Sequence, residues 1–451
     1  MRASGRQVPI RSTALAAAAA CLTVPAFAQP GTGVDILSHR LEITPDFQTQ
    51  ALTGRARIRL RVEQDGLREI VFSGNALVIE SARLDGLPVA VAARGKDLVF
   101  SPAAALRKGR TATLRVSYRG RPARGVNFSD TSVFTSYWAC DWMICSLDRP
   151  ADKAAFELRL TLPAGMKSLS VGTLRSVKAG PAGLEVHVWR ETRPYSSYLY
   201  GFAAGRFTQV MTRHGGYELA YLGATPVPRD MQALFGTTGA MARFLEDKAG
   251  MPLPVKRYTQ LLVPGSEAQE AATYSVIGLK QIEPILQDPR NDWVIVHELA
   301  HQYWGNLITS RTWDHLWLNE GMAVFMTAAW KEHRFGRAAY DGELDIARAR
   351  LGRARQAGFD KPLTFAGPYP DIATRRAVQY SKGALFLDHL RTLLGDEAFW
   401  AALKRFTRAH AGGVVDSRDF QRSFEESSGR DLTATFNAWV HAGDARDQAG
   451  T

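Results

Sequence analysis

The stretch Val296–Gly305 reads Val-His-Glu-Leu-Ala-His-Gln-Tyr-Trp-Gly and contains the pattern His-Glu-x-x-His. Residues four apart on an α-helix lie one turn apart on the same face, so His297 and His301 can hold one metal ion together. Glu298 projects beside them and can take a proton from a water on that metal. The plainer alternative is a pair of core histidines on an amphipathic helix. The spacing favours a zinc-binding helix.

The residues around this motif support a helix. Apolar side chains recur at helical spacing and form a stripe made of Trp293, Val296, Ala300, Tyr303 and Trp304. Asn291 or Asp292 is expected to cap the amino end, and Gly305 is expected to stop the helix. We therefore expect an amphipathic helix that carries both histidines and ends at Gly305.

A catalytic zinc needs a third protein ligand and one open position. The segment Trp313–Gly321 reads Trp-Asp-His-Leu-Trp-Leu-Asn-Glu-Gly and begins a second helical pattern, with Asp314 as the expected cap. Glu320 follows His301 after eighteen intervening residues. A connection of that length can fold the second helix back against the first. The sequence therefore predicts one zinc ion per chain, held by two histidines and Glu320.

With these residues the chain resembles the aminopeptidase N and leukotriene hydrolase family of zinc peptidases, the gluzincins of peptidase family M1. The resemblance rests on the thirteen residues from His297 to Thr309, on Leu316–Gly321, and on Tyr380-Ser-Lys-Gly-Ala. In this family the tyrosine of Tyr-x-Lys-Gly stabilises the oxyanion, and the resemblance gives that role to Tyr380. It also implies a saddle-shaped β domain followed by a thermolysin-like catalytic domain.

Residues 1–28 have the pattern of a secretory signal. A short apolar run, Thr13–Val24, follows three positive charges and precedes the small-x-small sequence Ala26-Phe27-Ala28. The run is too short to span a membrane. A lipoprotein signal that uses Cys21 is the weaker alternative. We expect a periplasmic or secreted protein whose mature chain begins near Gln29.

The composition is that of a soluble chain with two substantial cores, since 45% of the 451 residues are hydrophobic and 10% are aromatic. The formal charge is +12, and it is +9 without the three arginines of the leader. The basic residues are spread along both halves, and no nucleic-acid-binding motif occurs, so we expect no nucleic acid partner. Outside the cytoplasm, a disulfide between Cys140 and Cys145 is plausible.

Residues 29–210 alternate apolar and polar side chains in many short runs separated by turn signals, as in Ala56–Val62. This pattern predicts a β-sandwich domain. From residue 211 the runs become longer and helical, so we place the catalytic domain at 211–451 in a multidomain α+β fold. Many members of the family continue with a large helical domain. This chain ends at Thr451, so we expect a short form with a more open cleft.

An aminopeptidase must hold a free α-amine, and the family does so with a Gly-x-Met-Glu-Asn strand before the zinc helix. The resemblance matches this strand to Ala272–Leu279, which places Ser275 where the family has its glutamate. Ser275 and Tyr274 are therefore the expected substrate-binding residues. Three acidic residues could substitute as the amine anchor: Glu267, Glu270 and Asp141.

Two further departures from the family concern residues around the metal and the amine. The β domain of the family adds a Gln or Glu about a dozen positions before the residue that matches Asp148, and Phe134–Tyr137 offers neither. Thr327 stands where relatives often carry a glutamate that supports a zinc histidine. Loss of such support weakens metal affinity.

The expected chemistry is peptide hydrolysis, with Glu298 as the general base and Tyr380 as the oxyanion donor. The leading hypothesis is an aminopeptidase-like metallopeptidase that acts on short peptides. One alternative is an oligo- or endopeptidase that needs no free amino end. The other is a zinc-containing peptide-binding protein without turnover. Oligomeric state and side-chain preference stay open.

Overall fold

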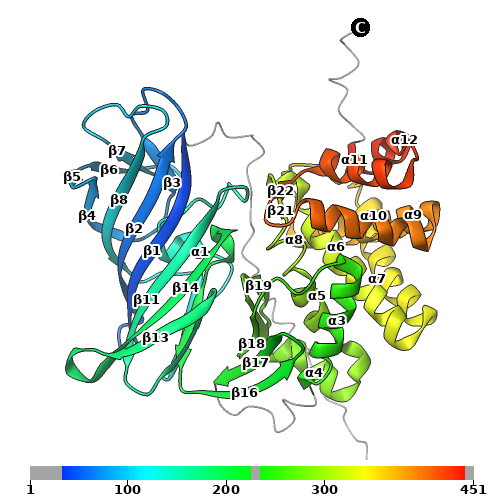
Figure 1. The fold of residues 1–451 in the computed structure, drawn as a ribbon, viewed down its shortest axis with the longest axis horizontal. Helices are drawn as coiled ribbons and strands as arrows, with labels where there is room; N and C mark the ends of the chain where they lie inside the picture. The colour runs from blue at the N-terminus through cyan, green and yellow to red at the C-terminus, as the bar shows by residue number, and fades with distance from the viewer. Residues whose placement is uncertain (1–32, 225–233, 442–451) are drawn as a thin grey trace, which may run out of the picture.

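The computed structural model describes residues 33–224 and 234–441. The expected signal segment, 1–28, lies outside the described residues. Figure 1 shows a β-rich part formed by the first half of the chain, next to a mainly helical part formed by the second half. This arrangement confirms the expected order of a β domain followed by a helical catalytic domain.

The β-rich part is built on an eight-stranded sheet with the order β13-β14-β11-β1-β2-β8-β4-β5. Strand β2 (Ala51–Val62) alternates buried and exposed side chains along its length, so one face of the sheet meets the core and the other meets solvent. The remaining strands are β1 (Val34–Asp46), β4 (Val78–Leu84), β5 (Leu87–Pro88), β8 (Thr111–Gly120), β11 (Lys153–Pro163), β13 (Thr173–Ala179) and β14 (Leu184–Ser196).

Two smaller sheets pack on the buried face of the large sheet and close one hydrophobic core. They are β3 (Ile70–Ser73), β6 (Ala90–Arg94) and β7 (Asp97–Ser101), and β9 (Val126–Phe128), β10 (Ser132–Thr135), β12 (Lys167–Ser170) and β15 (Phe202–Gly205). The short helix α1 (Ala139–Trp142) follows β10 in the sequence, and Cys140 forms a disulfide with Cys145.

A five-stranded sheet, ordered β16-β17-β18-β20-β19, joins the two parts of the molecule. Its strands are β16 (Phe207–His214), β17 (Tyr217–Ala224), β18 (Arg257–Val263), β19 (Ala268–Ala271) and β20 (Tyr274–Gly278). Leu261 on one face belongs to the first core, and Leu262 on the other face belongs to the second core. The expected boundary at 210/211 falls inside β16.

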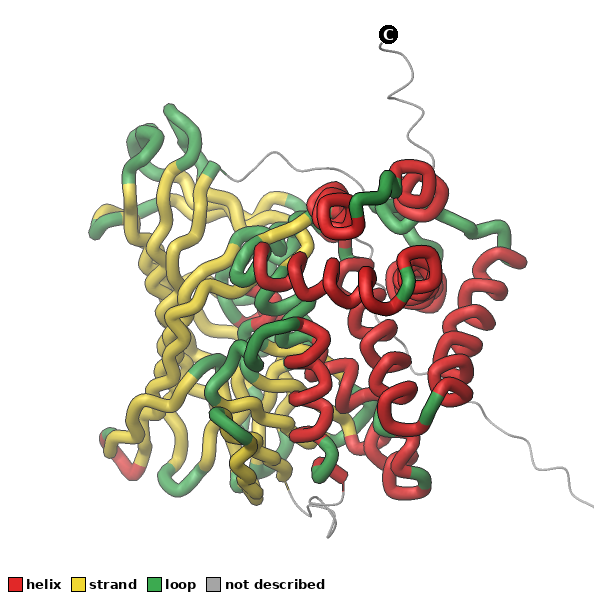
Figure 2. The backbone as a smooth tube through the Cα atoms, turned by 45° about the vertical axis from the view of Figure 1, so that its right-hand side comes forward, coloured by secondary structure: helices red, strands yellow, loops and turns green. Residues whose placement is uncertain are grey.

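The second core lies among helices, which Figure 2 draws in red. They are α3 (Thr238–Ala249), α4 (Leu279–Gln287), α5 (Trp293–Ala300), α6 (Trp317–Phe335), α7 (Arg337–Gln356), α8 (Ile372–Arg375), α9 (Gly383–Leu394), α10 (Asp396–Ala409), α11 (Ser417–Ser428) and α12 (Thr433–Phe436). The two strands β21 (Thr309–Ser310) and β22 (Val414–Val415) pair beside them. Among the described residues, no helix is both long and apolar enough to cross a bilayer.

Two glycines bring the elements of the site together. A Cβ added at Gly321 in α6 would lie 2.8 Å from the Cα of Gly383, and one added at Gly383 would lie 2.9 Å from the Cα of Gly321. Real Cβ atoms do not approach backbone so closely, so only glycine allows this contact. The approach brings the segment that carries Tyr380 next to the helix that carries Glu320.

Candidate metal centre

The zinc-motif helix is α5, and it ends at the second histidine, His301, rather than at Gly305 as expected. His297 lies in its last turn, while His301 follows at the carboxyl end with helical backbone angles. Asp292 occupies the cap position but makes no capping bond. Its carboxylate is buried and instead accepts hydrogen bonds from the indole of Trp330 and the guanidinium of Arg334. The expected cap is therefore correct in position and not in its bonding.

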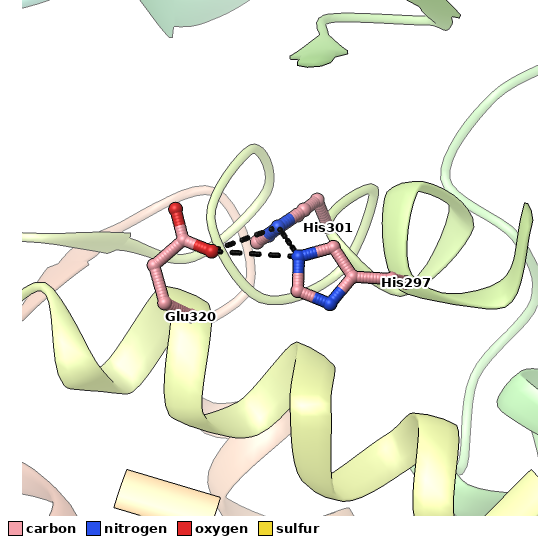
Figure 3. Close-up of side chains that lie close together, drawn as sticks. All are labelled: His297, His301 and Glu320. Carbon is pink, nitrogen blue, oxygen red and sulfur yellow. Dashed lines mark hydrogen bonds and ion pairs between the residues drawn. The ribbon is translucent and has the colours of Figure 1, made fainter. Parts of the chain in front are cut away.

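Three donor atoms converge at one point, as Figure 3 shows. The Nε2 atoms of His297 and His301 are 3.2 Å apart, and they lie 3.5 and 3.4 Å from Oε2 of Glu320. Zinc bonds of 2.0–2.2 Å arranged tetrahedrally place ligand atoms about 3.3–3.5 Å apart. All three side chains are buried. The donor set and its spacing fit one zinc ion.

Hydrogen bonds around the donors set their orientation. Nδ1 of His301 lies 3.0 Å from the carbonyl oxygen of Trp304, which assigns the proton to Nδ1 and leaves Nε2 free to bind a metal. The hydroxyl of Thr327 donates to the carbonyl of Ala323 within α6, so its hydrogen bond is made inside its own helix. Burial lowers the pKa of His301, but the carboxylates of Glu320 and Glu270 outweigh burial and raise this pKa to about 10.

Glu298 lies beside the donors with a free carboxylate oxygen. Its side chain is buried, and Oε2 has no hydrogen-bond partner among the described residues. Burial raises the pKa of Glu298, and nearby Glu270 and Glu320 raise it further, against the lowering effect of His301. A buried acceptor without a partner is costly unless a water or substrate occupies the space before it.

Tyr380 reaches the metal donors from a segment later in the chain than α5 and α6. It lies in a π-helical turn, Arg376–Lys382, directly before α9. Its ring lies parallel to the imidazole of His297, with ring centres 6.4 Å apart and planes 4° apart. Burial raises the pKa of its hydroxyl, and the charge of Glu320 adds to this effect. Tyr380 therefore keeps its proton and can donate a hydrogen bond beside the metal position.

The acidic residue on the strand before the zinc helix is Glu270. Donor atoms of Glu270, Glu298 and His301 lie within 4.8 Å of one another. Burial raises the pKa of Glu270 to about 7, although His301 opposes this rise. Glu270 belongs to β19, the edge strand of its sheet. This strand reads Ala-Gln-Glu-Ala, and the Gln-Glu pair is the sequence signal that a shifted alignment to Met-Glu would have found.

The expected substrate residues lie elsewhere. Ser275 has no exposed surface, and its hydroxyl accepts a hydrogen bond of 2.9 Å from the hydroxyl of Tyr258. Tyr274 is likewise buried in the core, and burial raises its pKa. Both are interior residues of β20 in this structure. The structure therefore does not place Ser275 beside the metal donors; the carboxylate that lies there is Glu270, five residues earlier in the chain, on β19.

The other two acidic candidates are placed differently. Asp141 pairs with the guanidinium of Arg124 at 2.7 Å. Glu267 precedes β19 and has a buried Oε2 without a partner among the described residues. Of these three acidic residues, only Glu270 lies close to the donor atoms of the metal site.

Sequence reasoning missed the residues that hold β19 in place. Gln302, directly after the second histidine, donates to the carbonyl of Ala271 and accepts from the amide of Thr273, each at 3.0 Å. Asn306 donates to the same carbonyl of Ala271. On the outer side, the hydroxyl of Tyr137 lies 2.9–3.0 Å from both the carbonyl and the amide of Ala268. For Gln302 and Asn306, the signal in the sequence was their place within or just after the zinc motif. For Tyr137, the sequence held no such signal.

Comparisons with known proteins agree with this geometry. The "Peptidase M1 N-terminal domain" model matches residues 36–199, and the "Peptidase family M1 domain" model matches residues 235–439. The chain is 23% identical to a probable aminopeptidase 1 of Saccharolobus solfataricus, over 89% of this chain and 53% of that protein. It is 26% identical to aminopeptidase M1-C of Oryza sativa subsp. japonica, over 92% of this chain and 50% of that protein.

The chain thus spans about half the length of these relatives. A solved structure with the same fold is that of a mutant M1 zinc metallopeptidase from Deinococcus radiodurans bound to a Tyr-Ser-Ala substrate. It has a TM-score of 0.76 and 23% identity, and covers 90% of this chain and 94% of that one.

Proposed function

Because the chain belongs to peptidase family M1, the aminopeptidase N family of zinc metallopeptidases, we propose that it is a zinc-dependent aminopeptidase acting on short peptides. The observation that carries this proposal is Glu270. Its carboxylate lies within 4.8 Å of donor atoms of Glu298 and His301, at the edge strand nearest the metal position. A carboxylate there attracts the ammonium of a peptide's free amino end.

The chemistry follows from the roles of the side chains. His297, His301 and Glu320 would hold a zinc ion, which would supply a Lewis acid to polarise the scissile carbonyl and acidify water. Glu298 accepts the proton of the attacking water and delivers it to the nitrogen of the leaving amine as the C–N bond breaks. The hydroxyl of Tyr380 donates to the oxygen that becomes negative in the transition state.

Edge-strand geometry supports binding of an extended peptide. In the antiparallel pair of β19 with β20, Glu267 and Gln269 point their backbone groups toward β20, as the bond from the amide of Gly278 to Glu267 shows. The backbone groups of Ala268 and Glu270 therefore point away from β20. Those of Ala268 contact Tyr137, which leaves the position at Glu270 for a substrate. A short peptide fits this restricted edge better than a long one. The tripeptide on the Deinococcus relative is consistent with this size.

The test uses the zinc-loaded chain and one peptide set offered with free and with acetylated amino ends. We expect release of single amino-terminal residues from the free peptides only, read by mass spectrometry. Glu270→Gln should raise KM for free peptides by about tenfold or more, because a buried charged hydrogen bond is lost. Glu283→Gln, an exposed change of the same chemistry on α4, is the control. Equal cleavage of free and acetylated peptides would contradict an amine anchor.

One observation favours a second candidate, an oligo- or endopeptidase. The β domain offers no Gln or Glu in Phe134–Tyr137, and Ser136 instead accepts a hydrogen bond from Asn127. With a single anchor, the requirement for a free amine would be weaker than with two. Internal cleavage of acetylated peptides in the same assay supports this candidate.

We also propose one zinc per chain and a location outside the cytoplasm. The Cys140–Cys145 disulfide supports an oxidising compartment, as does the leader pattern in residues 1–28. Metal analysis of the purified chain should give about one zinc per chain, and His301→Ala should lose it. Cell fractionation followed by sequencing of the mature amino end tests the location, with cleavage expected after Ala28.

A further inference from the structure

The exposed face of the eight-stranded sheet carries arginines that are far apart in the sequence and adjacent in space. Directly opposed residues on six neighbouring strands form one line across the sheet, which we name the arginine row: Arg190, Glu157, Arg40, Arg57, Arg115 and Arg83. Neighbouring strands are about 4.8 Å apart, so the row spans about 24 Å. Five of its six positions are arginine.

Two flanking rows extend this charge along the strands. On one side, Glu42 stands opposite both Arg159 and Arg55. On the other side, Arg59 stands opposite Ser38 and Thr113. The three rows together hold eight arginines and two glutamates, and no aromatic side chain. The buried face of the sheet packs on the smaller sheets, so this charged face is the solvent side.

The two glutamates neutralise only part of this charge, and Glu42 lies 3.8 Å from Arg55. Glu157 pairs with Arg40 at 3.1 Å and with Arg159 at 3.6 Å. Within residues 33–224 and 234–441, no carboxylate lies within 4.0 Å of the guanidinium groups of Arg57, Arg59 or Arg115. Like charges directly opposite one another destabilise a sheet. On the four neighbouring strands β1, β2, β8 and β4, arginine stands directly opposite arginine. An anion bound from outside would remove this repulsion.

The shape of the face favours phosphate groups. A hollow of about 220 Å³ opens on it, lined among others by Ser38, Arg40, Arg57, Arg59, Glu157 and Arg190. The planar guanidinium binds phosphate oxygens through two parallel hydrogen bonds, which lysine cannot do. Proteins that bind single-stranded nucleic acid stack bases on aromatic side chains, and the three rows have none.

We propose that the arginine row and its two flanking rows dock the protein on an anionic phospholipid surface. Rows two residues apart along a strand are about 7 Å apart, so the charge extends about 24 Å across the strands in the arginine row and about 14 Å along β2, from Arg55 to Arg59. A two-dimensional array of this kind complements a surface of headgroup phosphates, whereas a linear polyanion needs one line only. The rows are dominated by charge and hold no aromatic side chain to insert into a bilayer, which predicts an electrostatic, salt-sensitive attachment that leaves the catalytic half in solution.

The test is flotation of the full chain with vesicles of phosphatidylcholine, with and without about 30% phosphatidylglycerol. We expect binding to the anionic vesicles only, and its loss when ionic strength rises about tenfold. Arg57→Glu should weaken binding to the anionic vesicles about tenfold or more, because it lowers the net charge at the centre of the arginine row by two. Arg353→Glu, an exposed arginine on α7, makes the same change in net charge elsewhere and should have less than about a twofold effect.

Unfolding of Arg57→Glu cannot mimic this result. The new carboxylate would face Arg40 and Arg115 on the neighbouring strands, so the melting temperature should stay equal or rise. Equal loss of binding by the two variants would overturn the proposal, because total charge would then explain it. Binding to polyphosphate without binding to vesicles would also overturn it, in favour of a soluble polyanion.

Discussion

At the scale of single residues, Glu298 is the group whose removal should separate turnover from metal binding. Glu298 is not one of the three metal donors His297, His301 and Glu320. Its Oε2 atom is buried near these donors and has no hydrogen-bond partner among the described residues. We expect Glu298→Gln to lower kcat by about 10²- to 10⁴-fold, because proton transfer by a positioned carboxylate is lost. Zinc content, measured by elemental analysis, should not change. If kcat were unchanged in this variant, Glu298 would not be the general base, and equal, negligible hydrolysis by both proteins would favour a peptide-binding protein.

His39 provides a pH prediction away from the metal. Its imidazole is buried against Tyr200, and burial lowers its pKa from 6.5 to about 4. The unfolded chain therefore binds a proton more readily than the folded chain between these values. The contribution of His39 to the free energy of unfolding should be constant above pH 6.5, fall by about 3 kcal/mol as the pH drops to about 4, and stay level below.

The variant His39→Phe isolates this effect, because other groups also titrate in acid. Its free energy of unfolding, measured by urea denaturation at about pH 7 and about pH 4.5, should fall less than that of the wild type. An equal fall in both proteins would show that protonation of His39 does not oppose folding.

At the scale of elements, the contact between Gly321 and Gly383 positions the segment that carries Tyr380. An added methyl at Gly383 would lie 2.9 Å from the Cα of Gly321. Gly383→Ala should therefore cost about 1–3 kcal/mol of stability and reduce kcat, because the segment carrying Tyr380 is pushed away from α6. Thermal unfolding and peptide hydrolysis measure the two effects.

A glycine in an open position supplies the control. A Cβ at Gly342 in α7 meets nothing within 4 Å. Gly342→Ala should stabilise the protein by about 1 kcal/mol, through helix propensity alone, with unchanged kcat. Similar behaviour of the two variants would mean that the close approach of α6 and α9 does not govern the site.

At the scale of the whole molecule, Lys153 ties the large sheet to the catalytic part. Its ammonium, on β11, donates to the carbonyls of Leu307 at 2.8 Å and Gly413 at 2.9 Å, with Asn306 and Gly412 slightly farther away. Lys153→Ala should lower the free energy of unfolding by about 2–3 kcal/mol, since the carbonyl of Leu307 loses its charged donor and the carbonyl of Gly413 keeps only the amide of Thr309. Chemical denaturation measures this loss, and Lys178→Ala, an exposed change on β13, should have almost no effect.

The sequence alone determined the metal donors and the order of the two parts of the chain. Helical spacing places His297 and His301 on one face. The sequence also predicted that a second helix brings Glu320 to these histidines, and Figure 3 shows the three side chains together. These inferences succeed because helix periodicity and ligand chemistry are local properties, readable within one turn or one connection.

Only the tertiary structure decided which carboxylate stands beside the metal and where the arginines gather. Glu270 rather than Ser275 lies there because β19, and not β20, is the edge strand. The arginines of β2 are far in the sequence from those of β1, β8 and β14. The register of the strands alone brings these arginines into one row. Strand order and register are set by contacts between residues far apart in the chain, which local patterns do not encode.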